Sequence, residues 1–258
     1  IDIITYTWTT LQMIFSKDKT LQWTWQALKW WFVWEWLVGY YPFDETAGTV
    51  AYDKSPFANN WTLSWVTLPI WTGGKVNNAL RFTTPSTTSA RSWWVVLINK
   101  YNWNQNILDN ALFTFSFWTK GDVDSDSKNY TSQVIKNFVP WGMETFSFSW
   151  NHARTNYSHA TAVWVKSNKW MTSYTNTILK KDIWYLITSS FDGKYLRIYV
   201  NWTLENKVLV EKPLLWDWLL NIWRWSVSQY FHWIIDEVRV YNRALSDNEV
   251  MMLYNVSK

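Results

Sequence analysis

One loop-like stretch of this sequence carries side chains that could bind a metal ion. Asp53, Asn59 and Asn60 lie close together in it. Carboxylate, amide and backbone carbonyl oxygens are the ligands that Ca²⁺ prefers in proteins, so the stretch could contribute to a calcium site. The same three side chains could instead cap a turn by hydrogen bonding to the backbone. The residues alone leave both interpretations open.

A second acidic stretch invites comparison with the calcium loop of an EF-hand. It contains Asp122, Asp124 and Asp126. An EF-hand loop requires Gly at its sixth position and Glu at its twelfth, where this chain has Ser127 and Gln133. We therefore interpret the stretch as a solvated hairpin loop that binds cations weakly if at all.

The sequence predicts no catalytic residues and therefore no enzyme. Retaining glycosidases hold two carboxyl groups about 5 Å apart, but Asp236 and Glu237 are consecutive, and a regular strand would point them to opposite faces. The three histidines, His152, His159 and His232, are isolated from one another. Cysteine is absent, which excludes a thiol nucleophile, disulfides and thiolate metal sites.

The most unusual feature of the composition is 25 Trp against 7 Gly. Glycine normally makes up roughly 7% of residues. Trp repeatedly follows a residue that usually precedes Gly in a tight turn, where only Gly adopts positive φ without steric cost. These pairs are Asn60-Trp61, Ser64-Trp65, Asn102-Trp103, Pro140-Trp141, Asn201-Trp202 and Asp217-Trp218. An indole at such a position is expected to be strained and exposed.

We explain this pattern by the hypothesis that the gene decodes UGA as glycine and was translated here with UGA as tryptophan. Trp118 and Trp184 are expected to be authentic, because each falls inside an alternating strand pattern where an aromatic side chain packs well. The alternative is a genuinely Trp-rich protein whose indoles stack on ligands or lie in a membrane interface. The apolar run at residues 30–43 is too short to span a bilayer and is interrupted by Glu35.

Alternation of apolar and polar residues with a period of two dominates the chain and predicts many short β-strands. The clearest cover residues 111–119, 144–149, 183–191, 195–201, 204–210 and 234–241. Helix is predicted only near the C-terminus, where Ser246 and Glu249 form a capping box before residues 250–254.

The chain divides into two regions by composition. Residues 1–35 are interpreted as the end of an upstream region followed by a hinge, and residues 36–258 as one large β-domain. The sequence begins at Ile1 without a signal peptide, so it is interpreted as a fragment or a mature segment. The net charge of +4 comes from scattered basic residues, whereas nucleic-acid binding needs a concentrated basic patch. We therefore predict no nucleic-acid partner and no stable membrane insertion.

From residue 37 to 254 the chain resembles the laminin-G-like domains of the concanavalin A-like lectin/glucanase superfamily, especially their bacterial variety. The resemblance rests on the opening strand and loop at residues 37–49, the Asp-x-Ser loop at 53–63 and the stretch at 74–82. It continues through the hairpin at 184–201, and its most specific part is the stretch at 233–246. Trp61, Trp202 and Trp233 stand where the family has Gly, which agrees with the recoding hypothesis.

The resemblance implies an all-β jelly-roll sandwich of two antiparallel sheets with a short C-terminal helix. It also implies that Asp236 could approach Asp53, Asn59 and Asn60 and complete a structural Ca²⁺ site. Alternatively, Asp236 would pair with Arg239 or Arg243.

The function that this resemblance implies is a non-catalytic recognition module that binds glycans or proteins outside the cell or at its surface. The alternative is an architectural spacer in an adhesin or pilus-like protein, and a glycoside hydrolase is the third choice. Tyrosines in loop-like contexts could stack on sugar rings, but no binding site is chosen among them; they are Tyr101, Tyr130, Tyr157, Tyr174 and Tyr230.

Overall fold

The structure is a computed structural model that describes a defined part of the chain. The described residues are 36–64, 69–82, 94–98, 112–122, 124, 132–138, 144–151, 162–166, 170–210, 219–224 and 233–257. The chain divides into two units after Glu35, and the second unit, Trp36–Lys258, contains all the described residues. The predicted N-terminal segment and hinge, residues 1–35, therefore lie outside them.

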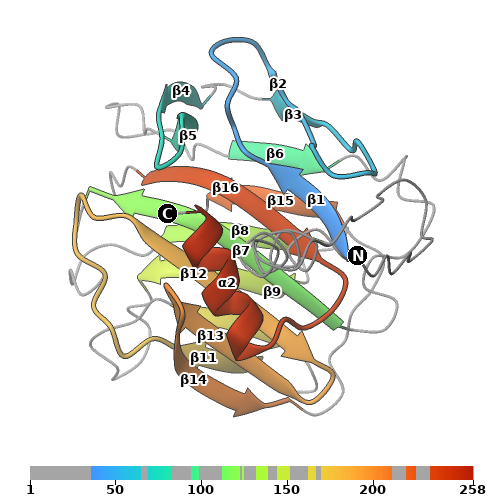
Figure 1. The fold of residues 1–258 in the computed structure, drawn as a ribbon, viewed down its shortest axis with the longest axis vertical. Coiled ribbons are helices and arrows are strands. Elements are labelled where there is room, and N and C mark those ends of the chain that lie inside the picture. The colour runs from blue at the N-terminus through green and yellow to red at the C-terminus, as the bar shows by residue number, and fades with distance from the viewer. Residues whose placement is uncertain are drawn as a thin grey trace, which may run out of the picture. The chain divides into compact units, whose positions relative to one another are not determined.

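Two antiparallel sheets build the domain (Figure 1). Among the described residues the first sheet has eight strands, and β16 pairs with three of them, β7, β5 and β1. In sheet order its strands are β14 (Thr203–Leu209), β13 (Tyr195–Val200), β12 (Tyr185–Asp192), β7 (Leu112–Gly121), β16 (Trp233–Tyr241), β5 (Asn78–Phe82) and β4 (Ile70–Gly73), with β1 (Leu37–Tyr41) on β16.

The second sheet also has eight strands, and all its pairings are antiparallel. Its order is β11 (Trp170–Tyr174), β10 (Ala162–Lys166), β9 (Glu144–Asn151), β8 (Ser132–Phe138), β15 (Leu219–Arg224), β6 (Trp94–Ile98), β3 (Trp61–Ser64) and β2 (Val50–Ala51). Strands distant in sequence are neighbours in both sheets. The predicted all-β jelly-roll sandwich is thereby confirmed.

Strand β7 shows how the alternating pattern positions side chains. Phe113, Phe115 and Phe117 belong to the hydrophobic core, whereas Thr114 and Ser116 alternate with them on the opposite face. That polar face is also buried. The strand predicted at 183–191 begins at Tyr185 instead, so Trp184 lies just before β12 and not inside it. The preceding turn at residues 181–182, with a positive φ at Asp182, delays the start of the strand.

The polar face of β7 is buried because helix α2 (Asp247–Ser257) lies against it (Figure 1). The Trp118 indole N–H donates to the Ser257 hydroxyl over 3.1 Å, and the Tyr199 hydroxyl donates to Asp247 over 2.7 Å. The predicted capping box is confirmed, because the Ser246 backbone N–H donates to the Glu249 carboxylate over 2.8 Å and the Ser246 hydroxyl accepts from the Glu249 N–H. The helix extends beyond the predicted residues 250–254.

Several aromatic side chains stack on one another in the core formed by the described residues. The ring of Trp61 stacks on Tyr41 at a centroid distance of 3.7 Å, and Trp233 stacks on Phe82 at 5.3 Å. Both indoles are fully buried. The expectation that Trp at these positions would be exposed is therefore wrong for Trp61 and Trp233, because each begins a strand whose first residue faces the core. It holds for Trp202, which is 47% exposed.

Candidate functional site

The carboxylate of Asp53 organises the loop between β2 and β3. One oxygen accepts hydrogen bonds from the backbone N–H groups of Tyr40 and Ser55, both at 2.8 Å. The other accepts from the Ser55 hydroxyl and from the Asn59 N–H, again at 2.8 Å. Asp53 is buried, and four accepted bonds use the hydrogen-bonding capacity of a carboxylate. The side chain therefore ties the loop to β1.

The two predicted asparagine ligands have different surroundings. The Asn60 side-chain oxygen accepts from the Asp53 N–H over 3.0 Å, which closes the turn. Asn59 is buried, and its backbone carbonyl accepts from the Tyr41 hydroxyl over 2.7 Å. Its side-chain amide oxygen and nitrogen have no hydrogen-bond partner among the described residues. Asp53, Asn59 and Asn60 are thus held together in one loop, as the sequence predicts.

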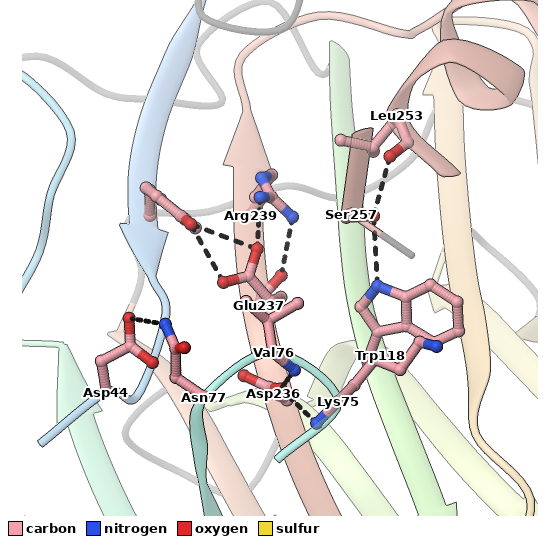
Figure 2. A network of polar contacts seen from close by, with 11 residues as sticks. Asp44, Lys75, Val76, Asn77, Trp118, Asp236, Glu237, Arg239, Leu253 and Ser257 are labelled. Carbon is pink, nitrogen blue, oxygen red and sulfur yellow. Dashed lines mark hydrogen bonds and ion pairs between the residues drawn. The ribbon is translucent and has the colours of Figure 1, made fainter. Parts of the chain in front are cut away.

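Asp236 is held by a different segment, the turn that precedes β5 (Figure 2). One carboxylate oxygen accepts from the backbone N–H groups of Lys75 and Val76, at 2.8 and 2.9 Å. Gly74 makes this approach possible, because a Cβ there would lie 2.6 Å from the same oxygen and 2.5 Å from the Asn78 carbonyl oxygen. Asp236 is fully buried. Burial raises the pKa of its carboxyl from 3.8 to about 7, against the opposing effect of the two N–H donors.

A buried ion pair lies immediately beside Asp236 on β16. The Glu237 carboxylate accepts from the Arg239 guanidinium and from the Tyr40 hydroxyl, the latter at 3.0 and 3.1 Å (Figure 2). Arg239 also lies over the Tyr40 ring, 4.5 Å from its centroid. Burial raises the pKa of the Tyr40 phenol, so it stays protonated and donates. Arg239 therefore pairs with Glu237 and not with Asp236.

A β-bulge breaks the alternation predicted for Asp236 and Glu237. The register of β16 against β7 shifts between Asp236 and Arg239, and Glu237 has a φ of 56°. Glu237 therefore turns toward Arg239 instead of alternating away, and the expectation of opposite faces does not hold at this bulge. Both carboxylates are nonetheless buried and engaged by protein donors. A substrate could not reach them, so the pair lacks the open cleft that catalysis needs.

The described contacts do not bring Asp236 to the Asp53 loop. Asp236 lies opposite Trp118 in the sheet, on the side that carries α2, whereas Asn59 is bonded by Tyr41, whose ring belongs to the core. Asp53 has no free acceptor for a cation. Among the described residues, no group of three or more His, Cys, Asp or Glu could hold a metal ion. Two of the four predicted ligands, Asp53 and Asp236, are thus held by donors from different segments, and a Ca²⁺ ion, which needs 6–8 oxygen ligands, stays a prediction.

The second acidic stretch is only partly described, and its described part contacts a neighbouring loop. Asp124 accepts from the Lys180 ammonium and the Lys181 N–H, both at 2.8 Å, and the Lys180 bond holds its pKa below the usual value. Asp126 lies outside the described residues, as do His152, His159 and His232. Of the tyrosines considered for sugar stacking, only Tyr174, half-buried at the end of β11, is described.

Sequence inspection missed one surface feature, a ring surrounded by cations on the β13–β14 hairpin. Tyr195 has Lys207, Lys194 and Arg197 within 4.1, 5.3 and 5.7 Å of its ring centroid. Lys207 is far from Tyr195 in sequence and becomes its neighbour only through the strand register. The Asp192-Gly193-Lys194 turn is the sequence feature that could have pointed to this surface, because it predicts the β12–β13 hairpin that carries the Tyr195 ring.

Comparison with known families gives a match over residues 98–251, more than half of the chain. The matching family is described as the concanavalin A-like lectin/glucanases superfamily. No curated protein matches the sequence.

Solved structures share the fold at low sequence identity. The binding domain of botulinum neurotoxin DC, solved with rat synaptotagmin II, is 12% identical with a TM-score of 0.65, over 88% of this chain and 52% of that one. The binding domain of Paraclostridial mosquitocidal protein 1 is 17% identical with a TM-score of 0.65, over 87% and 53%. A botulinum neurotoxin type C structure, from work on cell entry through two ganglioside molecules, is 13% identical with a TM-score of 0.64, over 88% and 52%. The present chain thus spans about half the length of these structures.

We predict that Asp236→Asn flattens the dependence of stability on pH. Because folding raises the pKa of Asp236, its protonated form stabilises the fold fully below about pH 4, and this contribution is lost as the pH rises through about 7. The wild type should lose up to about 1.4 kcal/mol of unfolding free energy per pH unit in that window. The variant has a neutral amide there and should not.

Urea unfolding between these pH values measures the effect. Asp182→Asn is the matched control, because Asp182 is exposed and its positive φ is tolerated by Asn. Equal slopes for the wild type and Asp236→Asn would contradict the raised pKa.

Proposed function

We propose that this chain, which belongs to the concanavalin A-like lectin/glucanases superfamily, is a non-catalytic recognition module for a glycan or protein outside the cell. The observation that carries the proposal is the use of the acidic residues at the candidate site. Asp53, Asp236 and Glu237 are buried, and each accepts hydrogen bonds from backbone or side-chain donors. The groups that resemble a catalytic or metal-binding set therefore hold loops and strands in place.

The structural neighbours support a binding role without identifying the ligand. Their names refer to binding domains, one in complex with synaptotagmin II and one from work on gangliosides. These ligands belong to those proteins, which share only the fold with this chain. Among the described residues, no helix is long and apolar enough to cross a membrane. We propose an extracellular or cell-surface location, as is usual for modules with this fold, and an architectural spacer role as the alternative.

Binding and hydrolysis can be measured on the same preparation. We expect the chain to bind glycans on an array or extracellular proteins in a solid-phase assay, and to release no reducing sugar from polysaccharides. Binding to neither class would favour the spacer role. Any hydrolysis by the wild type would contradict the proposal: loss of hydrolysis in Asp236→Asn or Glu237→Gln would place the catalytic site at this pair, and unchanged hydrolysis would place it elsewhere in the chain.

The structural Ca²⁺ ion stays a prediction, and the contacts of its supposed ligands argue against it. A ligand that binds only the folded state raises the unfolding midpoint. Because Asp53 is saturated with donors and Asp236 faces another segment, we expect the same midpoint in Ca²⁺, in Mg²⁺ and in EDTA. A midpoint that rises in Ca²⁺ for the wild type but not for Asp53→Asn would restore the predicted site.

We also propose that several Trp are glycines encoded by UGA in the natural gene. Two exposed indoles support this. Trp36 is 53% exposed with a φ of 66°, a conformation that suits Gly, and Trp202 is 47% exposed in the turn between β13 and β14. Mass spectrometry of the natural protein should find Gly at 36 and 202 and Trp at 118, which serves as the control in the same spectrum. Intact Trp at 202 would contradict the hypothesis.

A further inference from the structure

The outer face of the β13–β14 hairpin brings cations together around one aromatic ring. Tyr195 and Arg197 alternate with the buried Leu196 and Ile198, so their side chains point away from the core. Arg197 lies opposite Lys207 in the register, which places Lys207 diagonally across from Tyr195 on the same face. The Lys207 ammonium is 4.1 Å from the ring centroid. The cluster therefore exists only because the two strands pair in this register.

The end of the hairpin is held in a defined conformation by the carboxylate of Asp192. One oxygen accepts from the backbone N–H groups of Lys194 and Tyr195, at 2.9 and 2.6 Å, and the other accepts from the Arg197 guanidinium at 2.6 Å. Gly193 supplies the positive φ that the turn requires. The ring and the cations beside it are thus positioned before any ligand arrives, which lowers the entropy lost on binding.

The cluster carries uncompensated positive charge. Asp192 offsets the charge of Arg197, with which it forms the ion pair. Lys194 and Lys207 are exposed, and neither forms an ion pair with any described residue. The ring attracts both cations but does not neutralise them. Two ammonium groups held near one ring are therefore arranged to receive an anion.

An apolar side chain adjoins these charges. Leu209 lies directly opposite Tyr195 in the register and is 46% exposed. The patch thus combines two unpaired ammonium groups with an exposed apolar surface beside them. An oxyanion fixed to a sugar ring matches both parts, because the anion meets the ammonium groups while the C–H face of the ring lies on the apolar surface.

We propose that the hairpin patch of Lys194, Tyr195, Lys207 and Leu209 binds an acidic saccharide, through a carboxylate or a sulfate on the sugar. The proposal rests on the recognition function proposed above and names its ligand class and site. The patch has too few cationic side chains to bind a membrane surface or a nucleic acid. Electrostatic membrane binding uses clusters of about 4–8 Lys or Arg, and nucleic-acid binding needs an extended basic stripe.

The test measures the affinity of the full chain for three soluble probes: 3′-sialyllactose, 6-sulfated lactose and neutral lactose. We expect binding of at least one of the acidic probes and little binding of lactose. Tighter binding of 3′-sialyllactose would identify the anion as a carboxylate, and tighter binding of 6-sulfated lactose would identify it as a sulfate. Lys194→Gln/Lys207→Gln should weaken that binding by about tenfold or more, because the double variant removes both charged donors to the anion. Vesicles containing phosphatidylserine are tested in parallel.

Two matched variants separate the patch from general electrostatics. Lys54→Gln/Lys181→Gln removes the same charge from exposed lysines elsewhere and should leave the affinity within about twofold, because long-range attraction between exposed charges is screened by salt. Tyr195→Leu keeps every charge but removes the ring that gathers the cations, and should weaken binding by about two- to fivefold. Circular dichroism confirms that each variant is folded.

Three outcomes would overturn the proposal: equal affinity of the Lys194/Lys207 variant and the wild type, equal loss in the Lys54/Lys181 control, or binding to vesicles that exceeds binding to the acidic sugars. If neutral glycans bind with the same affinity to the wild type and to all these variants, the hairpin patch is not the binding site. The proposed recognition function would still stand. Absence of binding to every glycan and protein tested would overturn both.

Discussion

The buried ion pair between Glu237 and Arg239 is the constraint on which the first sheet depends. It lies at the bulge of β16, the strand that pairs with β5 through its first half and with β1 through its second. The bulge turns Glu237 toward Arg239 and Tyr40. The ion pair therefore lies at the point of β16 where pairing with β5 ends and pairing with β1 begins. Removing one member of a buried pair leaves an uncompensated charge at a cost of about 3–5 kcal/mol. The contacts of Glu237 with Tyr40 and Arg239 therefore join β1 to β16 at the bulge.

Carboxylates serve as internal anchors throughout this domain. Each accepts two or more hydrogen bonds from backbone or side-chain donors. Asp53 holds the loop before β3, Asp236 the turn before β5, Asp192 the β12–β13 turn, and Glu205 the backbone at Asn176 and Thr177. In a chain without cysteine, these anchors fix the loops that disulfides fix in many small secreted domains. The same property explains why acidic residues in suggestive patterns here have structural roles.

The C-terminal segment determines which part of the first sheet a ligand could reach. Thr114 accepts from the Leu245 N–H and donates to the Arg243 carbonyl, and Ser116 and Thr188 share a hydrogen bond, so the polar side of β7 is closed. Helix α2 covers this region (Figure 1). The hairpin patch around Tyr195 keeps exposed cations and an exposed leucine. The recognition surface proposed for this module therefore lies on a part of the first sheet that α2 does not cover.

The elements that depend on local patterns could be predicted from the order of the amino acids. Alternation predicted β7, β9 and β13, and the Ser246–Glu249 capping box predicted the start of α2, because a strand or a helix start depends on residues within a few positions. The loop of Asp53, Asn59 and Asn60 could also be placed from its turn residues. Four features could be seen only in the folded chain: Asp236 faces another segment, the bulge redirects Glu237, Trp61 is buried and Lys207 contacts the Tyr195 ring. Each of these depends on strand register and on what covers a face, and residues distant in the chain determine both.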